Sequence, residues 1–460
     1  ESKFMIYQVD TICAQATAVG SGGIAIIRIS GPQALSDAEK VFFPYKKKNG
    51  LWKPRYMYLG EIRSGDQLID QALGVYFRAP NSYTGEDVFE LHCHGGIQAA
   101  KMTLDLLISL GVRPAEPGEF TKRAFLNGKM DISAAEAIAD QIGALSERGA
   151  QMAARQIQGE LARQIRQMQR QLTDILAEME AGIEYPEEDL ELEIAGEALP
   201  KLRVLQERMY VLQKSFTQGK LIREGIRVAL AGRPNVGKSS LLNAIFGEDR
   251  AIVSNIPGTT RDVITEHYQL HSLPVQFMDT AGVRETGDEV ERIGVERTHK
   301  AIDSASVVVL VLDGSEPLQE EDMQVYRYAK AQGIPLLIAL NKTDLPAKAT
   351  LQEVQGIFDA PCLEIAAVRS EGIEALLEEI YRKAVGDAGL QEGLVITNSR
   401  HAYALQKACN ALQDGISALE EGIDLDCASI DLHDAWRYLG EITGETLDEQ
   451  IIDRIFEKLC

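Results

Sequence analysis

Residues 232–240 read GRPNVGKSS and fit the spacing G-x-x-x-x-G-K-[ST] of a phosphate-binding loop. Gly232 and Gly237 allow backbone N–H groups to wrap around phosphate oxygens. Lys238 can reach the β- and γ-phosphates as a catalytic residue, and Ser239 can ligate magnesium. We therefore expect a bound nucleoside triphosphate with Mg²⁺. The loop residues expected to bind it are Asn235, Val236, Gly237, Lys238, Ser239 and Ser240.

A second motif, NKTD at residues 341–344, follows the apolar run IPLLIAL. The carboxylate of Asp344 can accept hydrogen bonds from the ring N–H and the exocyclic amine of guanine, a donor pair that adenine lacks. Asn341 can meet the purine edge, and we assign Lys342 to the same site. These residues favour GTP over ATP as the nucleotide.

Residues 278–285, MDTAGVRE, are expected at the γ-phosphate. Asp279 closes an apolar strand and is expected as a catalytic carboxylate in the outer shell of magnesium, while the Gly282 N–H can approach the γ-phosphate. Many GTPases place a water-orienting glutamine directly after this glycine, but here the position holds Val283. Either the chain is a slow switch, or another group positions the water.

The segment NIPGTTRD at residues 255–262 lies between these motifs, where GTPases have a switch segment that supplies a threonine hydroxyl to magnesium. We expect Thr260 in this role, with Thr259 as the alternative. A proline-glycine turn with ordinary β-branched neighbours is the competing interpretation.

The composition favours a soluble cytoplasmic protein of several domains. A chain of 460 residues with 45% hydrophobic content can form more than one core, its longest strongly apolar run is too short to span a bilayer, and no signal-peptide pattern opens it. The six cysteines contain no C-x-x-C pair, which argues against a disulfide framework. A net charge of −22 repels phosphodiester backbones, so a nucleic-acid substrate would require a local basic patch or a basic partner.

The elements that must position these motifs fall into a multidomain α/β pattern. Short apolar runs predict an N-terminal α+β domain at residues 1–127. Strands alternating with helical stretches predict a doubly wound, Ras-like domain at 223–385. Helical patterns at 128–222 and 386–460 must bury their apolar faces on each other, which makes one helical domain into which the α/β domain is inserted.

Two details of the helical parts follow from local patterns. Apolar residues recur at spacings of three and four from Ile157 through Leu161, Ile165, Met168, Leu172 and Ile175 to Met179, which predicts one face of a long helix. Residues 180–200 are acidic and contain Pro186 and Pro200, so we expect a connection there rather than a regular element.

Taken over nearly its whole length, the chain resembles the MnmE (TrmE) family of tRNA-modification GTPases. The shared segments include TICAQATAVGSGGIAIIRISG, NSYTGEDVFELHCHGG, PGEFTKRAFLNGKMD, PGTTRD and DTAGVRE, several of them outside the nucleotide motifs. The resemblance implies a tetrahydrofolate-binding and dimerising N-terminal domain, a discontinuous helical domain and an inserted G domain. It also implies a homodimer that, with the FAD flavoprotein MnmG, modifies carbon 5 of the wobble uridine of tRNA.

The resemblance also implies how GTP is hydrolysed without the glutamine. Family members use a potassium ion where other GTPases use an arginine finger, and matching motifs place this ion on Asn235, Ser254, Ile256 and Thr259. Glu291 of DEVERIG would orient the water as the catalytic glutamate. The base-cradling segment, usually Ser-Ala in the family, corresponds to Ala366 and Ala367, so only backbone N–H groups remain there.

For the folate, 5-formyl- or 5,10-methylene-tetrahydrofolate, the family positions correspond to Arg28, Glu90 and Lys129. A cation for the folate glutamate and a carboxylate for the pterin amide edge are chemically sensible. Family chains usually end Cys-apolar-Gly-Lys, and the present sequence ends at the cysteine, Cys460, whose thiol the family implicates in modification.

Two other functions are weighed against this one. The first is an Era-like regulatory GTPase switch in ribosome assembly, although the acidic helical tail does not resemble the basic RNA-binding appendage of that group. The second is a folate-dependent one-carbon transferase whose GTPase is purely regulatory.

Overall fold

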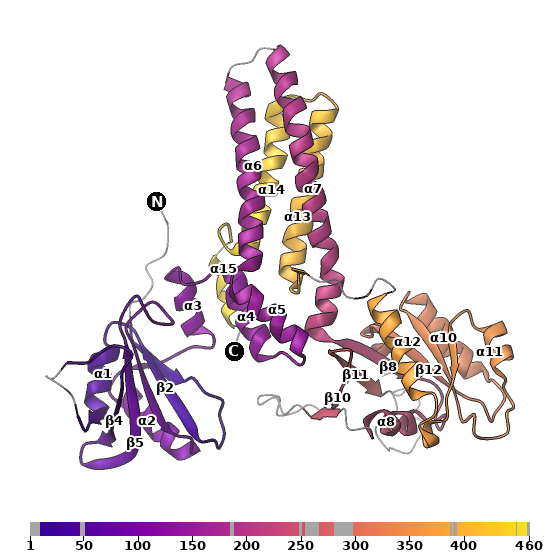
Figure 1. Ribbon diagram of the computed structural model, residues 1–460, viewed down its shortest axis with the longest axis horizontal. Helices are drawn as coiled ribbons and strands as arrows, with labels where there is room; N and C mark the ends of the chain where they lie inside the picture. The colour runs from indigo at the N-terminus through magenta and orange to yellow at the C-terminus, as the bar shows by residue number, and fades with distance from the viewer. Residues whose placement is uncertain are drawn as a thin grey trace. The chain divides into compact units, whose positions relative to one another are not determined.

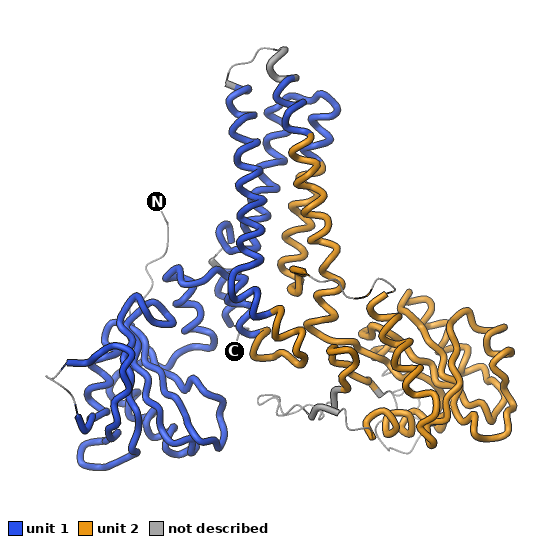
Figure 2. The backbone as a smooth tube through the Cα atoms, viewed as in Figure 1, with its two compact units in different colours: residues 1–139, 153–199, 414–460 blue, residues 140–152, 200–413 orange. Residues whose placement is uncertain are grey.

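The computed structural model describes residues 10–46, 51–184, 188–247, 251–253, 266–279, 298–386, 389, 393–447 and 449–457. The chain divides into two compact units, shown in blue and orange in Figure 2. One unit comprises residues 1–139, 153–199 and 414–460, and the other comprises 140–152 and 200–413.

The first unit contains a mixed sheet, some strands of which are labelled in Figure 1. The order of its strands is β3-β4-β5-β6-β2-β1-β7. Neighbouring strands are antiparallel except for β1 and β7, which are parallel. In chain order the strands are β1 (Ile12–Gln15), β2 (Ile24–Ser30), β3 (Phe42–Pro44), β4 (Met57–Ser64), β5 (Gln67–Phe77), β6 (Val88–His94) and β7 (Arg113–Pro114).

Helices α1 (Ala34–Val41) and α2 (Ile97–Ser109) share one hydrophobic core with this sheet. Alternate residues of β2 and β6, such as Ile27, Ile29 and Leu91, are fully buried in that core. Because side chains alternate across a strand, the residues between them face the other side of the sheet. The predicted N-terminal α+β domain is confirmed.

The helices of the first unit include two long helices that pack on each other. Helix α6 packs against α14, and the short α3 contacts α15. The helices that lie wholly in this unit are α3 (Glu119–Leu126), α6 (Glu160–Glu184), α14 (Leu425–Thr443) and α15 (Glu449–Glu457). Helices α4 (Ile132–Ile142) and α5 (Glu147–Ile157) each run across the boundary between the two units. The predicted apolar stripe of α6 is buried from Leu161 to Met179, whereas Ile157, at the end of α5, is partly exposed.

The predicted connection at 180–200 is wrong. Helix α6 continues to Glu184, and α7 (Glu188–Glu224) has Pro200 inside it. The proline removes one helical hydrogen bond, but Ala198 and Leu202 on either side of it are buried, and this packing outweighs the local cost. Gly219 also lies inside α7, where a Cβ would overlap with the carbonyl of Ile396, so its role is close approach.

The second unit contains a sheet in the order β14-β13-β12-β8-β11-β10-β9. Strands from β14 to β11 are parallel, and β10 is antiparallel to both its neighbours. The strands are β8 (Ile226–Ala231), β9 (Ala251–Val253), β10 (Glu266–Leu270), β11 (Leu273–Asp279), β12 (Val307–Asp313), β13 (Leu336–Asn341) and β14 (Cys362–Glu364).

Helices cover the parallel part of this sheet, as Figure 1 shows. They are α8 (Lys238–Phe246), α10 (Glu320–Ala331), α11 (Leu351–Ile357) and α12 (Ile373–Val385). Helix α13 (Ser399–Glu420) follows them in the chain and runs across the boundary between the two units. The pattern confirms the predicted doubly wound α/β domain. Since parallel strands end at one edge, β8, β11, β12 and β13 bring the segments that follow them to a common edge.

Among the described residues, no helix is long and apolar enough to cross a membrane.

Candidate nucleotide-binding site

The phosphate-binding loop connects β8 to α8, as the sequence predicts. Gly237 precedes α8 with φ of 101°, and Gly232 has φ of 141°, both values that favour glycine. A Cβ on Gly232 would overlap with the carbonyl of Val311, and one on Gly237 with the side-chain amide of Asn341. The loop therefore needs glycine for both its conformation and its packing. Asn235 also adopts a left-handed conformation, with φ of 64°.

Lys238 lies within this loop. Its ammonium donates to the carbonyl oxygens of Gly232 (2.6 Å) and Arg233 (2.7 Å), and the residue is buried. Ser239 and Ser240 occupy the first turn of α8, where Ser239 is exposed and Ser240 half-buried. The N–H groups of a first helical turn have no partner within the helix, so this end of α8 can bind phosphate oxygens.

Asn341 connects the phosphate-binding loop to the segment that contains Ala366 and Ala367. Its Nδ2 donates to the carbonyl of Val236 (2.9 Å), and its Oδ1 accepts from the N–H of Ala367 (3.0 Å). The residue is buried, as are both alanines. The structure thus brings together three segments that are separate in the sequence.

Lys342 is held by an aspartate that the sequence reasoning missed. Its Nζ lies 2.5 Å from Oδ2 of Asp313, the buried last residue of β12. Burial raises the pKa of Asp313, but hydrogen bonds from Lys342 and Ser315 outweigh it and hold the pKa below its usual value. Asp313 is therefore ionised and fixes the lysine. The sequence does carry a signal for Asp313, because it is an aspartate at the end of an apolar strand, as Asp279 is.

Asp344 and the alanine segment lie at the same end of the sheet. The Asp344 carboxylate is 3.7 Å from Nε of Arg369, a second residue not predicted from sequence. The Ala366 N–H donates to the carbonyl of Glu371 (3.0 Å). Val368, the next residue after Ala367, is 82% exposed.

Arg233 anchors the outer side of the phosphate-binding loop. Its Nε lies 3.0 Å from both carboxylate oxygens of Asp322, which is buried at the start of α10. Asp322 also accepts from the N–H of Gln319 in a capping box. The sequence motif leaves the residue after its first glycine open, so Arg233 gave no signal there.

Asp279 lies within the described part of the chain, whereas several other predicted residues do not. Asp279 ends β11 and is paired in register with Leu230 of β8, which places it at the edge where the phosphate-binding loop begins. The residues outside the description are Ser254, Ile256, Thr259, Thr260, Gly282, Val283, Glu291 and Cys460.

A separate cluster lies on the face of the N-terminal sheet away from α1 and α2. Arg28 of β2 and Glu90 of β6 are register partners, and Arg28 Nε donates to Glu90 Oε1 at 2.8 Å. The guanidinium lies over the rings of Tyr83 (5.1 Å) and Phe120 (5.4 Å), and His92 Nε2 is 3.3 Å from Glu90 Oε2. Sequence reasoning missed both aromatic residues.

Glu90 is ionised in this cluster. Burial raises its pKa, but contacts with His92 and Arg28 outweigh that effect and lower it below the usual value. A half-buried carboxylate flanked by aromatic rings can accept hydrogen bonds from a planar heterocycle.

Lys129 does not join the Arg28–Glu90 pair by any described contact. Its Nζ donates to the carbonyl of Pro80 (3.0 Å), and the residue lines a cavity of about 430 Å³. Neither Arg28 nor Glu90 lines this cavity, whose walls are Phe125, Gly128, Lys129, Met130, Asp131, Ala134, Ile157, Gln158, Gly159, Arg166, Thr443, Gly444 and Glu445.

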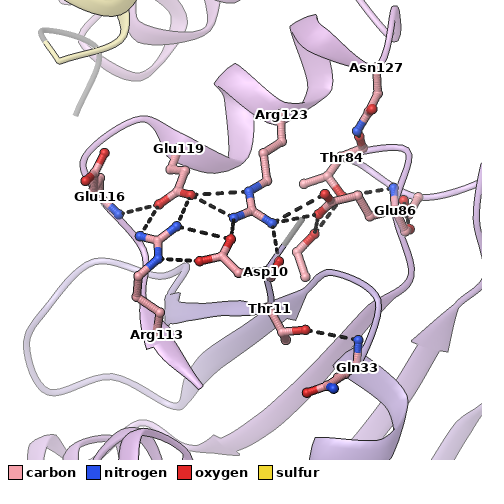
Figure 3. A network of polar contacts seen from close by, with 12 residues as sticks. Asp10, Thr11, Gln33, Thr84, Glu86, Arg113, Glu116, Glu119, Arg123 and Asn127 are labelled. Atoms are coloured by element: carbon pink, nitrogen blue, oxygen red, sulfur yellow. Dashed lines mark hydrogen bonds and ion pairs between the residues drawn. The ribbon is translucent and has the colours of Figure 1, made fainter. Parts of the chain in front are cut away.

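A buried ionic network supports the segments that carry Tyr83 and Phe120 (Figure 3). Arg123 of α3 is fully buried and contacts the carboxylates of Asp10 (2.6 Å), Glu119 (2.8 Å) and Glu86 (3.2 Å). Asn127 extends the network by donating to the carbonyl of Thr84 (2.7 Å). The network therefore ties α3, which carries Phe120, to the loop that carries Tyr83.

The glycine-rich loop before α8 and the Asn-Lys-x-Asp segment after β13, joined through Asn341, define a P-loop GTPase. The chain also matches two family models, one described as the GTP-binding protein TrmE N-terminus over residues 11–129 and the other as the MnmE helical domain over residues 132–460.

Curated relatives agree with these matches. The tRNA modification GTPase MnmE of Natranaerobius thermophilus is 42% identical over 98% of this chain and 99% of its own length. That of Clostridioides difficile is 43% identical over 98% of both chains, and that of Listeria welshimeri 40% identical over 98% and 99%. This chain belongs to the MnmE family of tRNA modification GTPases.

Membership settles the architecture and the kind of enzyme. The chain has an N-terminal α+β domain, a helical domain and a P-loop G domain, and it is a GTP hydrolase. An Era-like switch is not favoured, because the matching relatives are named as tRNA modification GTPases along nearly their whole length.

Proposed function

We propose that this chain is a potassium-stimulated GTP hydrolase that, with the flavoprotein MnmG, installs a carboxymethylaminomethyl or aminomethyl group on carbon 5 of the wobble uridine of tRNA. The one-carbon unit comes from a tetrahydrofolate. The observation that carries the proposal is the match to tRNA modification GTPases over 98% of the chain, which includes the N-terminal and helical domains as well as the nucleotide motifs.

Guanine selection depends on Asp344, supported by Asn341, Lys342, Ala366 and Ala367. The carboxylate of Asp344 accepts the two N–H donors of the guanine edge. The N–H of Ala367 is already bonded to Asn341, and that of Ala366 to Glu371. Among the described residues the N–H of Val368 has no such partner, so we assign it as a further donor to the guanine carbonyl.

Hydrolysis depends on groups that surround the γ-phosphate. Lys238 and the N–H groups of Asn235, Val236, Gly237 and Ser240 hold the phosphates, and Gly282 adds its N–H. Glu291 orients the attacking water, a role that the apolar Val283 cannot take. Magnesium would be held by Ser239 and by Thr260, with Asp279 in its outer shell, and would neutralise phosphate charge.

The residues of the loop also fit a potassium ion. The left-handed conformation of Asn235 leaves its side chain exposed, and its amide has no hydrogen-bond partner among the described residues. Ser254, Ile256 and Thr259 complete the ligand set that we propose. Potassium bound there would supply a fixed positive charge where negative charge develops in the transition state, without an arginine finger.

The folate site is proposed on the open face of the N-terminal sheet. The ionised Glu90 can accept from the amide edge of the pterin, and the rings of Tyr83 and Phe120 around Arg28 offer apolar walls. Lys129, which lines a cavity of about 430 Å³, would offer its ammonium to the carboxylate-bearing tail. We assign 5-formyl- or 5,10-methylene-tetrahydrofolate to this site and Cys460 to the modification chemistry.

The assembly we propose is a cytoplasmic homodimer that works in complex with MnmG and its FAD. The proposed domains are 1–127 for folate binding and dimerisation, 223–385 for GTP, and a helical domain formed by 128–222 and 386–460. The division of the chain into compact units supports a separate nucleotide-binding part, since 200–413 fall in one unit.

The test is complementation of a bacterium that lacks its own copy of this GTPase. Nucleosides of its tRNA are analysed by mass spectrometry after expression of the chain or of the Asp344→Asn variant. The chain should restore the modified wobble uridine and the variant should not. Unmodified tRNA with the chain expressed, folded and active as a GTPase would refute the proposal.

A further inference from the structure

The first half of α6 presents arginines to solvent in a strongly acidic protein. Arg163 and Arg170 are exposed, seven residues and thus about 10 Å apart along the helix. Gln167 lies between them and is also exposed. At 100° per residue, these side chains stand directly opposite the buried stripe of Leu161, Met168 and Leu172. We call Arg163, Gln167 and Arg170 the arginine face.

The charge on α6 is segregated along the helix. Residues 160–171 of α6 contain three arginines and one glutamate, whereas residues 172–184 contain four acidic residues and no basic one. The chain as a whole has a net charge of −22, so this segment is a local exception. A basic patch of this kind is the condition under which an acidic protein can bind a nucleic acid.

Helix stability does not explain this arrangement. Cations stabilise the C-terminal end of a helix, but here they stand in the first half, and the last turn has no basic residue. Arg163, Arg166 and Arg170 are spaced by three and four residues, so neighbouring like charges repel each other. The arginine face is therefore better explained by an external anion.

The arginines of the face also lack partners inside the protein. Among the described residues Arg166 is paired with Glu445 at 2.9 Å, whereas neither Arg163 nor Arg170 has an ion pair or side-chain hydrogen bond. Asp174, which is four residues beyond Arg170 and exposed, makes no pair with it in the structure. Both guanidinium groups are thus available for bidentate contacts with phosphate oxygens.

We propose that the arginine face of α6 binds the phosphate backbone of the tRNA substrate. The inference rests on the proposed function, which supplies tRNA as the substrate, and it adds the surface that receives it. RNA is favoured over an acidic protein because two guanidinium groups about 10 Å apart on one helix face can each contact a phosphate of the same continuous backbone.

The test compares the full-length chain with the double variant Arg163→Gln/Arg170→Gln, each in complex with the flavoprotein. The probe is an unmodified transcript of a tRNA with a wobble uridine, and its affinity is measured between 50 and 200 mM KCl. Affinity falls as salt rises, and each lost phosphate contact reduces the steepness of log affinity against log salt by about 0.7–0.9. The loss of two contacts should therefore reduce the steepness by about 1.4–1.8. Over this fourfold salt range the wild type should lose about tenfold more affinity than the variant.

Two further variants separate the face from general charge. Lys101→Gln/Lys348→Gln removes the same charge at two exposed positions elsewhere and should leave the slope unchanged. Arg163→Lys/Arg170→Lys keeps the charge and should keep most of the slope. GTP turnover without RNA should be the same in all variants.

The outcomes distinguish this inference from the proposed function. The inference alone is overturned if the salt slope of the Arg163→Gln/Arg170→Gln variant is unchanged. It is also overturned if Lys101→Gln/Lys348→Gln changes the slope by the same amount. Weaker association with the flavoprotein at an unchanged RNA slope also overturns it and makes the face a protein interface. If the wild-type complex fails to bind the transcript at all, the proposed function fails and the inference fails with it.

Discussion

Replacing Arg123 by methionine should sharply destabilise the N-terminal domain. Arg123 is fully buried among three carboxylates, with side-chain exposures of 24% for Asp10, 15% for Glu86 and 7% for Glu119. Arg113 also pairs with Asp10 (2.6 Å) and Glu119 (2.5 Å), so these two keep a cation after the substitution. Glu86 keeps no cation among its described partners after the substitution, and the hydroxyl of Ser30 (2.7 Å) still donates a hydrogen bond to it.

The expected loss in the free energy of unfolding follows from the charge of Glu86, which no longer has a cation beside it. Breaking a buried ion pair by removing one partner costs about 3–5 kcal/mol. Burial, together with the charges of Asp10 and Glu119, already raises the pKa of Glu86 in the wild type. A raised folded-state pKa means that protonation favours the folded state, so stability is lost as pH rises through that pKa. The cost of Arg123→Met should therefore be largest near neutral pH and shrink as the pH falls.

The assay can be confined to this domain because the chain has only two tryptophans. Trp52 packs against the N-terminal core, and Trp436 lies in α14. In a Trp436→Phe background, urea unfolding followed by Trp52 fluorescence reports the domain that contains Arg123. The control is Arg63→Met in β4 of the same domain, which breaks the pair of the exposed Arg63 with Glu61 and should cost about 1 kcal/mol or less. A loss below about 1 kcal/mol for Arg123→Met would refute a structural role for the network.

Three further substitutions test the two sites. Asp344→Asn should shift preference from GTP to XTP, because the amide presents a donor to the xanthine 2-carbonyl; unchanged GTP affinity in competition binding would remove the base assignment. Gly237→Ala should weaken GTP binding at least about tenfold, since its Cβ overlaps with Asn341, whereas Gly356→Ala, with open space around it, should bind normally; equal affinities would contradict the packing argument. Glu90→Gln should weaken 5-formyltetrahydrofolate binding about tenfold or more in calorimetry, because the amide would present an N–H donor to the donor edge of the pterin; Glu61→Gln, on strand β4 of the same sheet, is the control and should bind normally.

Much of the nucleotide site follows from local sequence. The loop at 232–240 has its glycines where the backbone needs left-handed angles, and the strand before it and the helix after it are strongly patterned. Asn341 could also be placed from local sequence, because it ends an apolar strand. Motifs of this kind combine residue type with a fixed element boundary, so they can be read without the fold.

The partners that hold these residues could not be read in the same way. Asp313 and Lys342 are 29 residues apart, and Arg28 and Glu90 are 62 apart, so only the sheet registers bring them together. A fully buried arginine such as Arg123 is also contrary to the usual surface position of its type. Pro200 misled the interpretation for a related reason, because packing on both sides of it overrides the local signal.

The most direct test of potassium-stimulated hydrolysis is GTP turnover of the purified chain in potassium and in sodium at equal ionic strength. Dimerisation is recorded in the same buffers with GDP and aluminium fluoride. We predict strong stimulation by potassium, with potassium-dependent dimerisation, because Val283 cannot orient water and the proposed mechanism has a fixed cation in place of the arginine finger. Equal and slow rates in both salts would contradict this mechanism and leave a slow GTPase without the proposed cation.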